Sequence, residues 1–113
     1  MENLKKNAEF QKIYNFGKKS YGYYFLVFFM KNNLDHNRCG FVASKKIGNA
    51  VCRNRIKRLF REYYREMEEK IQVGYDFIFV GKRSAGEKFK ELKFQEMKKD
   101  IDKVFKRSNL FKD

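Results

Sequence analysis

Apolar positions along the chain recur in two spacings, and their succession predicts the elements of the fold. Near the start, Phe10, Ile13 and Tyr14 follow the i, i+3, i+4 spacing of one helix face. Asn7 is suited to cap this helix, and Gly17 stands where a glycine commonly follows the last turn. The pattern therefore predicts a short first helix that ends before Gly17.

Three further stretches have the pattern of strands. Residues 23–31 are rich in aromatic side chains and apolar on both faces, which is typical of a strand covered on both sides. The polar residues 32–37 have the length of a hairpin connection, so residues 39–44 are expected to form the returning strand. Residues 75–80, which follow Gly74, form another strand of the buried type.

Two longer stretches have helical spacing. Asn49 is suited to cap a long helix over residues 50–70, and the last helix covers about residues 91–106. The apolar arc of the long helix holds Cys52, Ile56, Leu59, Phe60, Tyr63 and Met67, and the stripe of the last holds Phe94, Met97, Ile101, Val104 and Phe105, with Leu92 outside it. This order of elements predicts an α+β or mixed α/β sandwich, with helices over a small sheet.

Length and charge narrow the class of protein. With 113 residues, the chain has room for one domain, 1–113, and one modest core. Lys and Arg number 27 and Asp and Glu 14, so the net charge is +13. A pI of about 9.8 is typical of nucleic-acid-binding domains. A hydrophobic content of 42%, with 18% aromatic residues, argues against disorder.

The cysteines and the single histidine do not form a recognisable metal motif. Cys39 and Cys52 lack CxxC spacing and His36 has no companion, so we expect no metal site. Residues 1–9 lack the apolar region of a signal peptide, and residues 21–30 are half the length of a membrane-spanning helix. We therefore expect a cytoplasmic protein in which both cysteines are packing residues.

Charge is concentrated in residues 45–65, which hold eight cations against Glu62 alone. Cations at a helix N-terminus oppose the helix dipole, at a cost of about 0.3–1 kcal/mol each, so stability does not explain them. A nucleic-acid backbone would stabilise them, and arginine favours bidentate phosphate contacts. The predicted RNA-binding residues are Lys45, Lys46, Arg53, Asn54, Arg55, Lys57, Arg58, Arg61 and Arg65, of which Asn54, Lys57, Arg58, Arg61 and Arg65 lie opposite the apolar arc.

The residues at the centre of this basic segment also carry a family resemblance. The run SKKIGNAVCRNRIKRLFRE, residues 44–62, closely resembles the signature of the bacterial ribonuclease P protein subunit, and Arg53-Asn54-Arg55 matches its RNR motif. The opening LKKNAEF, followed by Gly17-Lys18, is similar to the first helix of that family. The resemblance covers essentially the whole chain. Two departures are Cys52, just ahead of the motif, and the crowded aromatics of residues 23–29.

The resemblance implies a fold and a set of partners. The fold would be like the second domain of ribosomal protein S5: a mostly antiparallel sheet in the order α-β-β-(β)-α-β-α, with a left-handed βαβ crossover, contrary to the usual hand. The partners would be one catalytic RNA per protein, with Mg²⁺ held mainly by the RNA, and precursor tRNA, whose 5′ leader is removed. Carried over by position, the leader-binding residues would be Phe10, Tyr14 and Phe28. A single-stranded leader is held by aromatic rings beside cations, and Lys82 and Arg83, with Lys45 and Lys46, would supply that charge.

Several alternatives stand beside this interpretation. For Phe10 and Phe28, plain core packing is an equal alternative. A stand-alone nuclease would need clustered carboxylates or a histidine pair, whereas Asp100 and Asp102, at i and i+2 on a helix, point apart. We therefore predict no catalytic residue in this chain. A ribosomal or other structural RNA-binding protein remains the alternative function.

Overall fold

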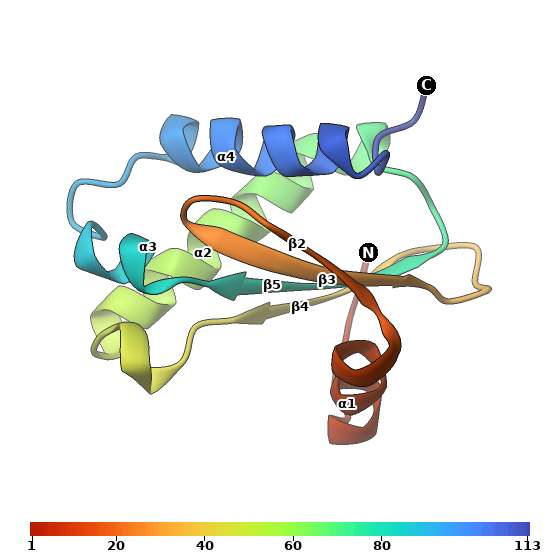
Figure 1. Cartoon of the computed structure of the whole chain (residues 1–113), viewed down its shortest axis with the longest axis horizontal. Helices are drawn as coiled ribbons and strands as arrows, with labels where there is room; N and C mark the ends of the chain where they lie inside the picture. Colours follow the sequence, from red (N-terminus) through yellow and green to blue (C-terminus); the bar gives the residue numbers. More distant parts are fainter.

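The computed structural model describes the whole chain, residues 1–113, as a five-stranded sheet between two unequal helical layers (Figure 1). In chain order the elements are β1 (Glu2–Asn3), α1 (Asn7–Phe16), β2 (Lys18–Tyr21), β3 (Phe25–Lys31), β4 (Arg38–Val42), the 3-10 helix η1 (Lys45–Ile47), α2 (Ala50–Met67), the 3-10 helix η2 (Glu68–Lys70), β5 (Tyr75–Gly81), α3 (Arg83–Glu87) and α4 (Phe94–Arg107). None of the helices combines the length and apolar character that crossing a membrane requires.

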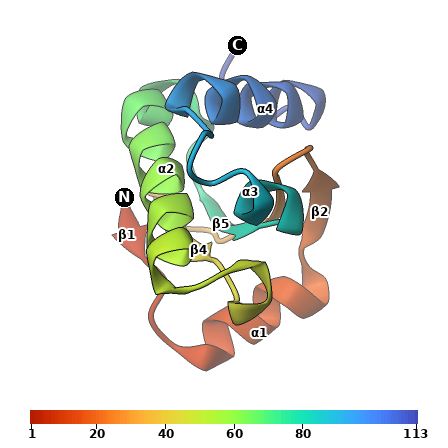
Figure 2. The same ribbon diagram turned by 90° about the vertical axis from the view of Figure 1, so that its left-hand side faces the viewer.

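The sheet has the strand order β1-β4-β5-β3-β2. The β2–β3 hairpin and the long β3–β5 pairing are antiparallel, and β4 pairs in parallel with β1 and β5. The sheet is therefore mixed, with helices packed on it, in agreement with the predicted α+β class. The predicted antiparallel pairing holds for β2, β3 and β5, whereas β4 pairs in parallel on both sides. The crossover from β4 through α2 to its parallel neighbour β5 is left-handed, as the two views together show (Figures 1 and 2).

The expected pairing of the strands at 23–31 and 39–44 is wrong, because β5 lies between them. At the centre of the sheet, Ile78 of β5 has Phe28 on one side and Gly40 on the other. The polar connection reverses the chain but does not fix the separation of the strands. Because Phe77, Ile78 and Phe79 are all fully buried, β5 requires neighbours on both sides and takes the central position.

The hairpin that the chain does form, β2–β3, lies earlier than expected. Its turn is closed by Gly22 N–H, which donates to the carbonyl of Phe25 at 2.8 Å. The carboxylate of Asp100 on α4 accepts from the backbone N–H groups of Tyr23 and Tyr24 at 2.8 and 2.7 Å, which fastens the turn to α4. The sequence pattern allowed a further strand without placing it at β2, and it started the next strand two residues too early, because Tyr23 continues the aromatic run.

The main core lies on the face of the sheet that α2 and α4 cover. The two predicted apolar arcs are buried there, apart from a partly exposed Phe94. Phe105 of α4 stacks on Phe77 and Phe79 of β5, with ring centroids 5.4 and 5.8 Å away. Asn49 caps α2 as predicted, since its side-chain oxygen accepts from Cys52 N–H at 3.0 Å. Cys39 and Cys52 are both buried packing residues, and burial raises the pKa of each thiol.

The other face of the sheet is only partly covered, by α1. Leu26, Phe28 and Met30, which alternate with the fully buried residues of β3, remain half-exposed on this side. The expectation of a strand covered on both sides is therefore met on one face only. The sheet keeps an open apolar area beside α1.

Both ends of α1 differ from the sequence-based expectation. Lys6, not Asn7, is the N-cap residue, and the Glu9 side chain accepts from the backbone N–H of Lys6. Gly17 has a negative φ of −76°, so it does not take the left-handed conformation expected after a helix. A Cβ at Gly17 would lie 2.6 Å from the carbonyl oxygen of Ile13. The glycine is required by this close approach of backbone.

Candidate nucleic-acid interface

The basic side chains of α2 lie largely as the helical wheel predicted, except that Lys57, expected opposite the apolar arc, is half-buried at its flank. Asn54, Arg58, Arg61 and Arg65 are exposed, while Arg53, Arg55 and Lys57 are half-buried at the flanks. None of these cations takes part in an ion pair, although ion pairs occur elsewhere in the molecule. Glu62, the one acid of the segment, is exposed and also unpaired. The outward side of α2 therefore presents uncompensated positive charge, which is the electrostatic requirement for holding a polyanion.

Two arginines of α2 have additional contacts within the protein. The Nη2 of Arg55 donates to the carbonyl of Leu92 at 3.0 Å and so ties α2 to the segment before α4. The guanidinium of Arg61 lies over the ring of Phe41, 5.6 Å from its centroid. Both contacts restrict the side chain without neutralising it. The structure thus gives Arg55 a structural contact that its position in the sequence did not indicate.

A second group of cations gathers at the carboxyl ends of β4 and β5. Lys45 and Lys46 are exposed on η1, which follows β4, and Arg83 is exposed at the start of α3, which follows β5. Figure 2 views the molecule from this end, where the amino end of α2 and α3 lie side by side. Lys82 is half-buried and donates from Nζ to the carbonyl of Gly22 at 3.0 Å. Its ammonium therefore also holds the β2–β3 turn.

Three aromatic residues predicted for the leader come together on the open face of the sheet. The ring of Tyr14 meets Phe28 edge-on at 4.8 Å, and Phe10 lies 6.3 Å from Tyr14. All three are half-buried, packed beside the small cluster of Leu4, Ile13 and Ile78. Burial raises the pKa of Tyr14. Each ring packs on the protein with one side and is exposed on the other, so a ligand can contact its outer face.

The sequence interpretation missed a cation beside these rings. The Nζ of Lys19, on β2, lies over the ring of Phe28 at 5.7 Å from the centroid. Lys19 pairs with Phe28 across the β2–β3 hairpin, which brings the two side chains to the same face. The adjacent pair Lys18-Lys19, directly after Gly17, was the signal in the sequence, but it pointed to this position only once β2 was known.

The position of α1, and with it of the aromatic group, depends on a charged cluster at its amino end. Arg38 on β4 donates from Nε and Nη2 to the buried carboxylate of Asp76, at 2.8 and 2.7 Å. Its Nη1 donates to Glu9 of α1 at 2.8 Å, and Glu9 in turn caps the helix. Asn32 adds a further hydrogen bond to Asp76 at 2.9 Å. This cluster joins α1, β4 and β5.

We expect Arg38→Met to destabilise the fold by about 3 kcal/mol, because it leaves the buried Asp76 carboxylate without its cation. The double variant Arg38→Met/Asp76→Asn, which removes both charges and keeps an amide for Asn32, should recover most of that loss. Urea unfolding of the two variants and the parent measures both values. A loss below about 1 kcal/mol for the single variant would contradict this account of how α1 is held.

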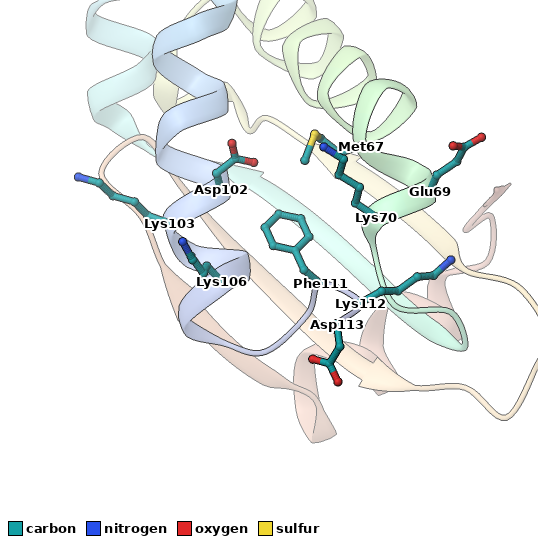
Figure 3. A pocket seen from close by; sticks show the side chains of 9 residues that line it. All are labelled: Met67, Glu69, Lys70, Asp102, Lys103, Lys106, Phe111, Lys112 and Asp113. Carbon is teal, nitrogen blue, oxygen red and sulfur yellow. The ribbon is translucent and has the colours of Figure 1, made fainter.

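The largest cavity, of about 680 Å³, lies away from all of these residues, between α4, η2 and the C-terminal segment. Figure 3 shows the ring of Phe111 directed into it, with Lys106 of α4 on one side and Lys70 on the other. These lysines stand near the carboxyl ends of helices, where the helix dipole favours cations, so local stability accounts for them. None of the residues predicted to bind RNA lines this cavity.

The fold and the unpaired basic face of α2 define a small α+β protein of the RNA-binding class. Comparisons with known proteins identify the family within this class. A family model described as Ribonuclease P matches residues 1–109, so the chain belongs to the ribonuclease P protein family.

Individual relatives agree with this membership over nearly the full chain. The ribonuclease P protein component of Fusobacterium nucleatum is 54% identical over 110 residues, which cover 97% of this chain and 99% of that protein. The one from Clostridioides difficile is 38% identical over 108 residues, 95% of this chain and 91% of that protein. The RNase P protein structure from Staphylococcus aureus superposes with a TM-score of 0.86 at 33% identity, covering 99% of each chain. The Thermotoga maritima structure also gives 0.86, at 32% identity over 95% of this chain and 97% of that one.

Proposed function

We propose that this chain is the protein subunit of a ribonuclease P that removes the 5′ leader of precursor tRNA, and that it holds the catalytic RNA against the outward side of α2. The observation that carries the proposal is the row of arginines on α2 without any carboxylate partner. RNA phosphates would supply the missing counter-charge, and each contact would release condensed counterions. The family supplies the identity of the RNA.

Capture of the protein from cells, followed by sequencing of the bound RNA, tests this assignment. We expect one dominant RNA, the ribonuclease P RNA, at one protein per RNA in the cytoplasm. Ribosomal RNA in its place would overturn the proposal in favour of a ribosomal protein. We propose that residues 1–113 bind the ribonuclease P RNA as a single domain.

Chemistry is assigned to the RNA, with Mg²⁺ held mainly by RNA phosphates. The residues of this chain do not fit a metal site of their own, because nowhere do three acid, histidine or cysteine side chains come close enough to hold an ion. Asp100 and Asp102 are each engaged in hydrogen bonds, to the β2–β3 turn and to Tyr63 respectively. What the protein supplies is charge neutralisation, which lets the catalytic RNA and the precursor approach each other.

The 5′ leader is proposed to lie on the open face of the sheet, against Phe10, Tyr14 and Phe28. Half-buried rings beside a cation are suited to single-stranded RNA, since bases stack on them without sequence preference. Lys82 and Arg83, at the carboxyl end of β5, would meet the phosphates of the same strand. The contact of Lys19 with Phe28 adds that lysine to the proposed leader site.

Phe28→Ala should weaken binding of leader-bearing precursor to the assembled ribonucleoprotein by about 1–3 kcal/mol, the usual value of one stacked base. Binding of mature tRNA should stay unchanged, because it lacks the leader. Dissociation constants for the two ligands, with thermal unfolding as a check on the fold, measure the difference. Phe28→Tyr keeps a stacking surface and serves as the control. Equal losses for both ligands would favour plain core packing of Phe28.

A further inference from the structure

A smaller cavity, of about 320 Å³, extends the basic face of α2 toward the segment between α3 and α4. It is lined by Val51, Arg55, Arg58, Phe89 and Lys90. Three cations thus surround two apolar side chains, and no carboxylate lines the cavity. None of the three cations forms an ion pair elsewhere.

Two apolar side chains lie at least partly exposed within this basic cavity. Val51 lies in the first turn of α2 with 68% of its surface exposed. Phe89 is half-buried, since one side of it packs on the main core. Neither residue needs to be apolar on its exposed side for the protein to fold. An apolar floor surrounded by cations is suited to a flat, uncharged aromatic ligand with a phosphate group on either side of it.

The walls of the cavity are held in place before any ligand arrives. The hydrogen bond from Arg55 to the Leu92 carbonyl, at 3.0 Å, joins α2 to the connecting segment that carries Phe89 and Lys90. The buried Leu92 side chain anchors the same segment in the core. Because the backbone on both sides is held in this way, the entropy lost on binding is mainly that of ordering the exposed side chains of Arg58 and Lys90.

We propose that this cavity receives one unstacked nucleobase of the RNA that binds α2, with the base on the Phe89 ring and Val51 and with its flanking phosphates on Arg58 and Lys90. The proposal rests on the proposed function, because the RNA must first lie along α2. It adds an aromatic contact to an interface that is otherwise electrostatic. The loss of a stacked base weakens binding without removing a phosphate contact, so its signature differs from that of an arginine.

The test is the affinity of Phe89→Leu for the ribonuclease P RNA as a function of salt concentration. Leucine keeps the packing on the core but removes the ring. We expect affinity to fall by about fivefold or more, the lower end of the effect of one stacked base. The slope of log affinity against log salt should stay unchanged. Phe89→Tyr should bind like the parent, and Arg58→Gln should lower both affinity and slope.

Phe111 supplies the matched control, because its ring is also half-buried on the core and also directed into a cavity bordered by lysines (Figure 3). Phe111→Leu should leave RNA affinity unchanged. Unchanged binding by folded Phe89→Leu, or an equal loss in Phe111→Leu, would overturn the proposal.

A second variant keeps the proposal testable if Phe89→Leu unfolds. Val51→Asn removes the other apolar contact with the base and leaves the charge of the surface as it is. Because the Val51 side chain is largely exposed, this change should leave the fold intact. Affinity should fall with the salt slope unchanged, and parent-like affinity of Val51→Asn would overturn the proposal. Parent protein that binds no RNA would instead overturn the proposed function.

Discussion

Purified protein, mixed with precursor tRNA and Mg²⁺ in the absence of the RNA subunit, is expected to produce no mature 5′ end. Addition of the RNA subunit should restore cleavage. Hydrolysis of a phosphodiester requires an activated water and stabilisation of the leaving oxygen, usually by paired metal ions. The cations of α2 would repel such ions from the surface where RNA is proposed to bind.

Several acids of the chain take part in structural contacts, which supports the same expectation. Asp76 is paired with Arg38, and Glu96 with Lys88. Asp102 accepts from the hydroxyl of Tyr63 at 2.6 Å, and burial together with this carboxylate raises the pKa of Tyr63 far above its ordinary value. These acids are held in contacts that stabilise the fold, in agreement with the expectation that the RNA supplies the catalytic groups.

The same cleavage assay also measures the expected contribution of the protein, which is to lower the salt concentration that the RNA needs. The RNA subunit alone should need high salt or high Mg²⁺ to cleave, and the protein should lower the concentration that is required, because it neutralises phosphates. A preparation freed of contaminating nucleases, with heat-denatured protein as its blank, is the necessary control. Cleavage at the mature 5′ end by RNA-free protein would contradict the division of roles.

The triple variant Arg53→Ala/Arg58→Ala/Arg61→Ala should weaken binding of the RNA subunit by about a hundredfold or more, at about 1 kcal/mol for each lost charge contact. The salt dependence is the sharper measurement. Each lost phosphate contact lowers the slope by about 0.7–0.9, so the triple variant should lose about 2–3 units. Filter binding or fluorescence titration at several salt concentrations gives both numbers.

The outer side of α4 offers a control with the same change in net charge. Lys99, Lys103 and Lys106 are exposed and form no ion pair. Their triple substitution by alanine should alter the slope little if the RNA lies along α2. An unchanged slope for the arginine variant, or an equal change for both variants, would remove those arginines from the interface and leave only a general effect of net charge.

The basic face of α2 could be predicted from sequence because it depends on one helix alone. A period of 3.6 residues places Arg58, Arg61 and Arg65 opposite Ile56 and Leu59 whatever the rest of the chain does. The N-cap at Asn49 and the apolar stripe of α4 could be predicted for the same reason, because each depends only on residues of its own helix. Such features follow from spacing and side-chain type.

Contacts between distant segments were beyond the reach of the same reasoning. The pattern of residues 75–80 indicated a buried strand but did not say that it would separate the two strands before it. The approach of Arg38 to Asp76 and Glu9, and of Phe89 to Val51, joins parts of the chain that share no periodicity. Family resemblance, not spacing, linked Phe10 and Tyr14 with Phe28.

Local spacing and side-chain chemistry were enough to predict the three longer helices, the buried strands, the basic face of α2 and the family to which the chain is similar, but not the short helix α3. Tertiary structure alone decided the central place of β5, the half-open face beside α1 and the cavity around Phe89. The physical reason is that burial must be satisfied across the whole chain at once. A strand that is buried on both faces, such as Tyr75–Gly81, takes the centre, and this choice determines which side chains remain exposed to a ligand.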